Sequence, residues 1–114
     1  MVMESTDVIT ALGNEYNPDI LRAAHQPRSA KEFSEDLEVP IATCYRRIEE
    51  LTEAELLSHH DRILTDGQRR TSVYRRNFDV IEIEFEGEDI SVTLQEHSPV
   101  QNKLDNVWRD LADT

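Results

Sequence analysis

The clearest pattern of hydrophobic and polar positions lies in the first half of the chain and predicts two short helices joined by a tight turn. Ser29 and the glutamate three residues later form a capping box, in which each side chain accepts a hydrogen bond from the other residue's backbone N–H. Phe33 and Leu37, four residues apart, give the first helix a hydrophobic stripe. Val39-Pro40 ends this helix and begins the next, because proline tolerates the first turn, where an N–H has no helical partner.

The second helix is predicted from residue 40 to about residue 54. Its hydrophobic positions recur at steps of three, four and three residues, which places them on one side: Ile41, Cys44, Ile48 and Leu51. The opposite side carries small, hydroxyl and charged residues: Ala42, Thr43, Arg46 and Glu49, with Tyr45 and Arg47 on its flanks. Arginine can grip guanine with two hydrogen bonds, and hydroxyl groups can reach phosphates or base edges, so this face suits the major groove of DNA. The alternative is a solvated helix whose arginines pair with Glu49, Glu50 or Glu53.

Two β-hairpins are predicted after the helices. Residues 57–77 contain two strand-like segments around Asp66-Gly67, a strong turn signal, and the tip carries Arg69 and Arg70. A basic hairpin directly after a reading helix is what a winged helix requires, and the alternative is a solvated surface hairpin.

Residues 81–86 and 90–95 alternate strictly on either side of a glycine, which predicts a second hairpin with one apolar and one acidic or polar face.

Short helices are also expected at both ends of the chain. Residues 6–12 place Val8, Ile9 and Leu12 at helical spacing, and a further amphipathic piece from Pro18 to Pro27 would bury three residues: Ile20, Leu21 and Ala24. After Ser98-Pro99 a terminal helix has a stripe of Val100, Leu104, Val107, Trp108 and Leu111. This stripe can pack on its own domain or against a second subunit, and we favour dimerisation.

These elements together predict an α+β fold. Residues 1–77 would form a DNA-binding domain, and residues 78–114 would add the acidic hairpin and a terminal dimerisation helix to the same compact unit.

Composition indicates a small soluble protein. The chain has 114 residues, 38% of them hydrophobic, and it lacks an apolar run near the roughly 18 residues that a membrane span needs. Nothing at the N-terminus resembles a signal peptide, so a cytoplasmic location is expected. A single cysteine cannot form an internal disulfide, which agrees with a reducing compartment.

The net charge and its distribution along the chain both bear on DNA binding. The net charge is -12, and ten of the twelve basic residues are arginine, a composition that resembles proteins from organisms with molar internal salt. Phosphate would repel such a chain, but at molar salt the Debye length falls to roughly 3 Å and local charge decides. Residues 62–76 contain five arginines and one acid, whereas residues 77–96 contain seven acids and no base. Only the first of these segments suits a phosphate backbone.

The order of capped helix, Val39-Pro40 turn, residues 43–51, Leu56-Leu57 and arginine-tipped hairpin resembles archaeal winged helix-turn-helix transcription regulators of the broad ArsR-like group. The composition resembles haloarchaeal members. The resemblance covers about residues 17–77 and implies a homodimer that binds promoter DNA. It implies that the readers are Thr43, Tyr45, Arg46 and Arg47 and that the wing contains Arg69 and Arg70. The reading helix lacks the paired cysteines of the metal-sensing members.

Other chemistry has weak support in the sequence. Cys44 is expected to be a core thiol, and a redox sensor is the sharper alternative. His59 and His60 are adjacent on a predicted strand and point to opposite faces, so a metal site is not expected. No phosphate loop or nucleophile with a base at motif spacing is present, and neither enzyme activity, a cofactor nor a small-molecule ligand is evident.

Two function classes follow. The first is a dimeric, sequence-specific DNA-binding regulator that reads the major groove with residues 40–54 and the flanking backbone or minor groove with residues 58–76. The second is a winged-helix protein-interaction module of a transcription complex that does not itself read DNA. The gradient of arginines favours the first.

Overall fold

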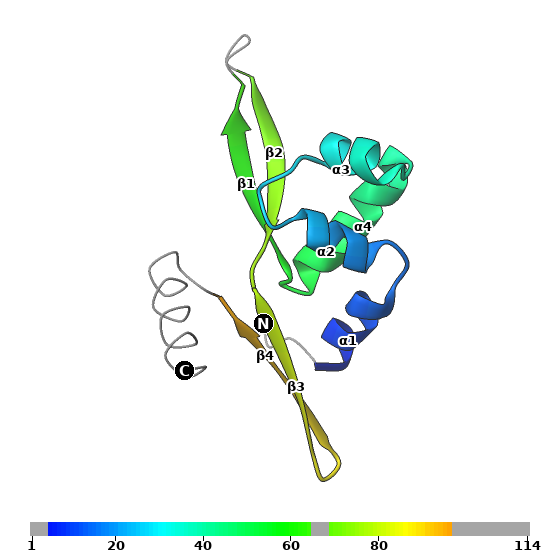
Figure 1. Cartoon of the computed structure of the whole chain (residues 1–114), viewed down its shortest axis with the longest axis vertical. Coiled ribbons are helices and arrows are strands. Elements are labelled where there is room, and N and C mark those ends of the chain that lie inside the picture. Colours follow the sequence, from blue (N-terminus) through cyan, green and yellow to red (C-terminus); the bar gives the residue numbers. More distant parts are fainter. Residues whose placement is uncertain (1–4, 65–68, 97–114) are drawn as a thin grey trace, which may run out of the picture.

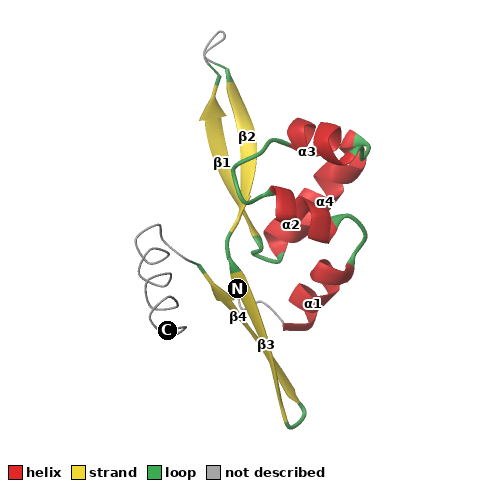
Figure 2. Ribbon diagram, in the orientation of Figure 1, coloured by secondary structure: helices red, strands yellow, loops and turns green. Residues whose placement is uncertain are grey.

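The computed structural model describes residues 5–64 and 69–96, and within them the chain folds as helices followed by strands (Figures 1 and 2). The helices are α1 (Ser5–Gly13), α2 (Asn17–Ala23), α3 (Ala30–Leu37) and α4 (Ile41–Glu53). The strands are β1 (Leu57–Ile63), β2 (Arg70–Arg76), β3 (Val80–Glu86) and β4 (Asp89–Gln95). They form two separate antiparallel two-stranded sheets, so the described part of the chain has the expected α+β architecture.

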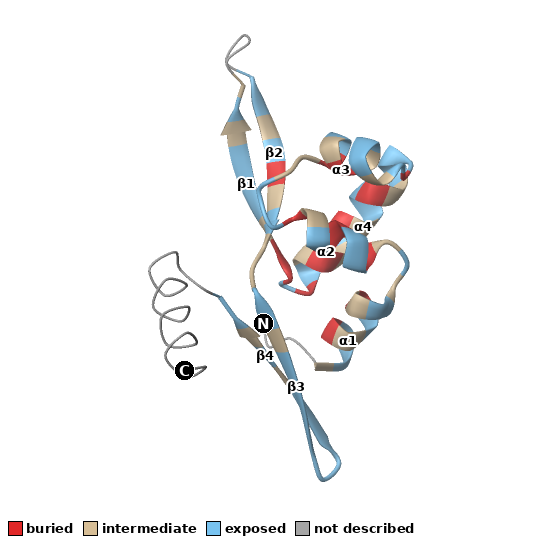
Figure 3. Cartoon of the chain, in the orientation of Figure 1, coloured by how far each residue is buried: buried red, intermediate tan, exposed pale blue. Residues whose placement is uncertain are grey.

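The core lies among the helices and the first residues of β1 (Figure 3). Its largest fully buried hydrophobic side chains are Phe33, Ile20, Leu51, Leu56 and Val8. Helices α3 and α4 pack on each other, and α2 packs on α3, so α4 is supported along one side. Burying such side chains stabilises the fold by about 1.5–3 kcal/mol each, which is the main force that holds α4 in place.

The capped helix α3 and the buried side of α4 agree with the sequence pattern. Ser29 and Glu32 form both hydrogen bonds of the capping box, and Cys44 and Leu51 are buried. Ile41 was expected on the buried side, and this was wrong, because its side chain is 42% exposed. It is the first residue of α4, one turn before Cys44 and beyond the part of the helix that meets the core.

The two N-terminal helices begin within one residue of their predicted starts. In α1 the buried residues are Val8 and Ala11, whereas the predicted Ile9 and Leu12 are only partly buried. Helix α2 buries the predicted Ile20 and Leu21. It ends at Ala23, before Pro27, the residue that was expected to end it. The backbone N–H of Ala24, its C-cap, donates to the Ile20 carbonyl at 2.9 Å, which completes the last turn.

The first hairpin is anchored at its base and exposed toward its tip. Leu57 pairs with Arg76 at one end of the register, and Ile63 pairs with Arg70 at the other. Val73 in β2 is buried, and Tyr74 exchanges two backbone hydrogen bonds with Arg28, at 2.8 and 3.0 Å. This bridge joins the hairpin to the segment just before α3. The predicted Asp66-Gly67 turn lies outside the described residues.

The second hairpin extends in the opposite direction from the first (Figure 1). Its strands pair so that the apolar residues share one face: Ile81 with Leu94, Ile83 with Val92, and Phe85 with Ile90. Ile81, Val92 and Leu94 pack against the core, and β4 contacts α1. Phe85, near the turn, is 74% exposed. Gly87 adopts a positive φ of 61° there, a conformation that glycine adopts without steric cost.

The predicted dimerisation stripe lies outside the described residues: Val100, Leu104, Val107, Trp108 and Leu111. None of the helices found in residues 5–64 and 69–96 is long and apolar enough to cross a membrane.

Candidate nucleic-acid interface

The turn between α3 and α4 fixes the direction in which α4 leaves the core. Glu38 caps α3 in the left-handed conformation, with φ 56° and ψ 44°. Val39 is buried, its N–H donates to the Ser34 carbonyl at 3.2 Å, and its carbonyl accepts from the Ser34 hydroxyl at 2.6 Å. Pro40 then serves as the N-cap of α4 without a side-chain hydrogen bond. A turn with this many constraints presents the first turns of α4 at a defined angle to the rest of the domain.

The outer face of α4 presents most of the predicted readers to solvent. Ala42, Tyr45 and Arg46 are exposed, and Thr43 is partly buried. Within the described residues, Arg46 makes no ion pair and only a long hydrogen bond of 3.4 Å from Nη2 to the Thr43 hydroxyl. Its guanidinium therefore keeps its donors available for an acceptor outside the protein.

Arg47 differs from Arg46. Its side chain is 25% exposed, and its Nη1 lies 3.2 Å from Oε2 of Glu50. The other carboxylate oxygen of Glu50 accepts hydrogen bonds from the side-chain amides of Asn14 and of the fully buried Asn17. The charge pairing that the sequence left open thus applies to Arg47, and its partner Glu50 ties α4 to Asn14 and Asn17 at the connection between α1 and α2.

Four of the five arginines of the first hairpin divide into two groups. Arg62 donates to Glu32 Oε1 at 2.8 Å and to the Pro27 carbonyl at 2.7 Å, and Arg76 donates to backbone carbonyls of the core. These two hold the hairpin against the helices. Arg69 and Arg70 are exposed and make no ion pair within residues 5–64 and 69–96. They are free to meet phosphate.

A polar hollow of about 240 Å³ lies where the start of α3, the exposed face of α4 and β2 meet. It is lined by Ser29, Ala30, Lys31, Tyr45, Arg70, Thr71, Ser72 and Tyr74. The lining contains two cations and several hydroxyl groups but no carboxylate, and it includes the first two residues of α3, at the positive end of the helix dipole. This combination suits a phosphate of a nucleic-acid backbone. The sequence prediction included Tyr45 and Arg70 but missed Lys31, Thr71 and Ser72.

The capping box also positions the wing, because Glu32 accepts both from the Ser29 N–H at 2.9 Å and from Arg62. The backbone hydrogen bond from Ser29 lowers the pKa of Glu32 below its ordinary value of 4.5, and Arg62 lowers it further against the opposing effect of burial. A carboxyl whose pKa falls on folding stabilises the fold when it is ionised. This stabilisation is present above pH 4.5 and is lost as the pH falls through the lowered pKa.

We therefore expect Glu32→Gln to lower the free energy of unfolding at pH 7 by about 0.5–1 kcal/mol, because the pair with Arg62 is partly exposed. The difference from the parent should shrink as the pH falls below 4.5. Urea unfolding at several pH values measures both effects. Glu35→Gln, an exposed change on the same helix, serves as control. A deficit for Glu32→Gln that is the same at low pH would contradict the ionic origin.

Cys44 is fully buried, and its Sγ faces the Val39 carbonyl at 3.9 Å. Burial raises the pKa of this thiol above its ordinary value of 9.0, whereas reactive cysteines are exposed and have a lowered pKa. The surroundings of Cys44 favour packing over redox sensing.

We expect that treatment of the native protein with peroxide leaves Cys44 reduced and the DNA affinity unchanged, as measured by mass spectrometry and gel shift. Oxidation that weakens DNA binding in the parent but not in Cys44→Ala would restore the sensor hypothesis.

His59 and His60 are both exposed on β1, and His59 pairs with Tyr74 across the hairpin register. The ring of His59 lies 2.9 Å from the Ser72 hydroxyl and 3.6 Å from an Asp61 carboxylate oxygen. In the part of the chain that the structure describes, no three histidine, cysteine or acidic residues gather as a metal site would require.

Comparison with protein families connects this geometry to a known motif. Residues 7–60 match the family model described as "Helix-turn-helix domain". The match supports a helix-turn-helix domain in this part of the chain. The matched range runs from α1 into β1 and includes the α3–α4 pair, and it supports a role in DNA binding. A search of curated proteins found no match to the chain.

Proposed function

We propose that the protein is a sequence-specific transcription regulator that binds promoter DNA as a homodimer. Helix α4 enters the major groove, where Arg46 reads base edges and Ala42, Thr43 and Tyr45 line the contact. Arg69 and Arg70 contact the flanking backbone or minor groove. The observation that carries the proposal is the cationic hollow beside α4, because Lys31 and Arg70 can hold a phosphate there while the first turns of α4 face the bases.

The distribution of charge supports this orientation. The cations of the hollow and the wing lie on the helix-turn-helix side, and the acidic strand β3 belongs to the hairpin that extends the other way (Figure 1). The net charge of -12 disfavours binding at low salt, but salt screens long-range repulsion. An archaeal, high-salt origin and a place in the ArsR-like group fit this proposal and rest on the sequence resemblance. We assign the protein no catalytic role.

Dimerisation is the second part of the proposal. Ile83, Phe85 and Ile90 leave an apolar strip of the second hairpin exposed in the described residues, and Val100, Leu104, Val107, Trp108 and Leu111 form the sequence stripe that we assign to the subunit interface. Exposed apolar surface of this kind is typical of interaction sites. Two copies joined here would place two α4 helices in successive major grooves, roughly 34 Å apart.

Selection of binding sites from a pool of random DNA duplexes tests the proposal without knowledge of the operator. We expect enrichment of a site with two inverted half-sites about one helical turn apart, at a salt concentration high enough to screen the net charge. Analytical ultracentrifugation should show a dimer. A protein that serves only as an interaction module would enrich no sequence, and this result would overturn the proposal.

A further inference from the structure

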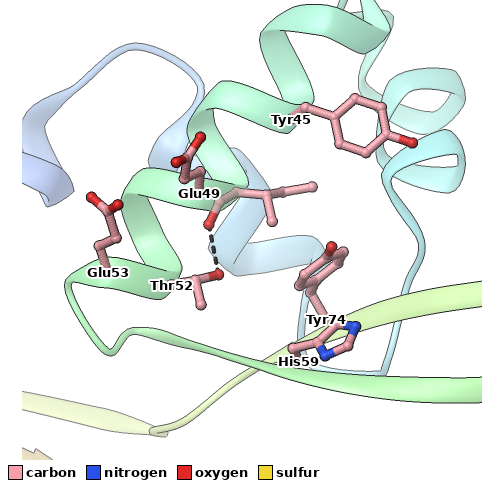
Figure 4. Close-up of a pocket in the computed structure, with 7 residues that line it drawn as sticks. Tyr45, Glu49, Thr52, Glu53, His59 and Tyr74 are labelled. Atoms are coloured by element: carbon pink, nitrogen blue, oxygen red, sulfur yellow. Dashed lines mark hydrogen bonds between the residues drawn. The ribbon is translucent and has the colours of Figure 1, made fainter.

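A second hollow lies between α4 and the first hairpin, and it shares Tyr45 and Tyr74 with the polar hollow of about 240 Å³. It is an open groove of about 400 Å³, lined by Tyr45, Ile48, Glu49, Thr52, Glu53, His59 and Tyr74 (Figure 4). This volume falls within the range of about 300–1,000 Å³ that is usual for small-molecule sites. Tyr45 lines both hollows, so anything bound in the groove would contact a residue of the proposed DNA interface.

The groove offers aromatic and apolar surface to a ligand. His59 and Tyr74 pack together on the hairpin side, with ring centroids 5.4 Å apart and an interplanar angle of 47°. Tyr45 is 57% exposed and stands on α4, opposite them (Figure 4). Ile48 lies on the same helix one turn further along. Aromatic faces on two sides of a groove attract flat apolar groups and cations, because the face of an aromatic ring is electron-rich.

The groove is lined by two acidic residues. Glu49 and Glu53 lie four residues apart on α4, both are exposed, and neither forms an ion pair within the described ranges. No lysine or arginine lines the groove. Two carboxylates at such spacing repel each other, and a cation placed between them would relieve that repulsion. An anion is disfavoured for the same reason.

We propose that this groove binds a hydrophobic organic cation, a molecule with aromatic or apolar groups around one positive charge. The apolar groups would contact Tyr45 and Tyr74, and the charge would lie near Glu49 and Glu53. A ligand held against Tyr45 lowers the affinity for DNA, because the side chain cannot serve the groove and the DNA interface together. The binding site stands without the proposed function, whereas this regulatory consequence rests on it.

Titration with a matched pair of ions tests the site in the absence of DNA. Tetraphenylphosphonium and tetraphenylborate have nearly the same shape and opposite charge. At about 0.1 M sodium chloride, where the Debye length is about 10 Å, isothermal titration calorimetry of the full chain should show saturable binding of the cation only. Equal binding of both ions, or binding of neither, overturns the proposal.

Variants then locate the site. The double change Glu49→Gln with Glu53→Gln should weaken binding of tetraphenylphosphonium by about fivefold to tenfold, since it removes both carboxylates and keeps the side-chain size. Glu82→Gln with Glu84→Gln on β3 removes the same net charge away from the groove and should leave the affinity unchanged. The same loss in both double variants would mean that the cation responds only to the overall charge, and the assigned site would be wrong.

An experiment with DNA tests the regulatory effect separately from the ligand site. Tetraphenylphosphonium should weaken binding of the parent to a selected DNA site, and the Glu49→Gln with Glu53→Gln variant should need more of the cation for the same effect. Equal sensitivity of parent and variant would overturn the regulatory step. If no DNA sequence is bound at all, the calorimetric titrations still decide the ligand site, and only the proposed function fails.

Discussion

Arg46→Ala is expected to relax base preference at one position of each half-site by about 1–3 kcal/mol, the usual contribution of a bidentate arginine–guanine contact. The expectation rests on the exposure of Arg46 on α4 and on its weak contact with Thr43, which leaves the guanidinium available. Competition gel shifts with every single-base change of a selected site measure it. The variant should bind the best site less tightly and discriminate less against changes at that position, while other positions keep their ranking.

Arg69→Ala is the matching change in the wing. It should weaken binding to all sequences alike and reduce the slope of log affinity against log salt by about one, because a phosphate contact carries no sequence information. Arg22→Ala on α2 removes the same charge far from the proposed interface, next to Asp19, and should change neither quantity. If Arg46→Ala and Arg69→Ala give the same profile, the division between base reading and phosphate contact is wrong.

Local signals predicted the elements of the helix-turn-helix domain well. The capping box at Ser29 fixed the start of α3, because its two hydrogen bonds involve residues only three positions apart. Pro40 marked the start of α4 for another local reason, because its fixed φ and missing N–H are tolerated at the beginning of a helix. Ile41 shows the limit of periodicity, since spacing alone does not tell which end of a helix extends past its neighbours. That depends on how α3 and α4 pack.

The sites were harder to predict because they join distant segments. Lys31 and Arg70 line one hollow although they are far apart in the sequence, and they meet because the Arg28–Tyr74 bridge joins the start of α3 to β2. The groove beside α4 likewise brings Tyr45 near Tyr74. No motif indicated a small-molecule ligand, since a groove is formed by packing. Its local trace on α4 is Glu49 and Glu53, which form no ion pair within the described residues.

Arg47 shows how tertiary contacts change the role of a residue. Spacing placed it on the flank of the exposed side, and the family resemblance implied that it reads DNA like Arg46, with a nearby glutamate as the alternative partner. In the folded chain Glu50 forms an ion pair with Arg47. It also accepts hydrogen bonds from the amides of Asn14 and Asn17, two residues more than thirty positions away. We therefore expect Arg47 to position α4 more than to read bases.

Glu50→Ala should consequently be the most damaging of the polar changes in α4 and lower the free energy of unfolding by about 2–4 kcal/mol. Removing this carboxylate leaves the partly buried Arg47 and Asn14 side chains without their acceptor, and unpaired polar groups cost about 1–3 kcal/mol each, whereas the Asn17 amide keeps its hydrogen bond to the Ala11 carbonyl at 2.7 Å. Urea or thermal unfolding measures the loss. Glu49→Ala, one residue earlier and exposed, should stay within about 0.5 kcal/mol of the parent.

The double variant Arg47→Ala with Glu50→Ala decides whether the network acts as a unit. If Arg47 and Glu50 stabilise each other, the double variant loses less free energy of unfolding than the sum of the two single losses. The interaction energy should then reach about 0.5–3 kcal/mol. Part of the loss must remain in the double variant, because Asn14 still lacks its acceptor and Asn17 keeps only its bond to the Ala11 carbonyl. Strictly additive costs would mean that the 3.2 Å contact between Arg47 and Glu50 contributes nothing, and Arg47 would then be available to DNA as the sequence implied.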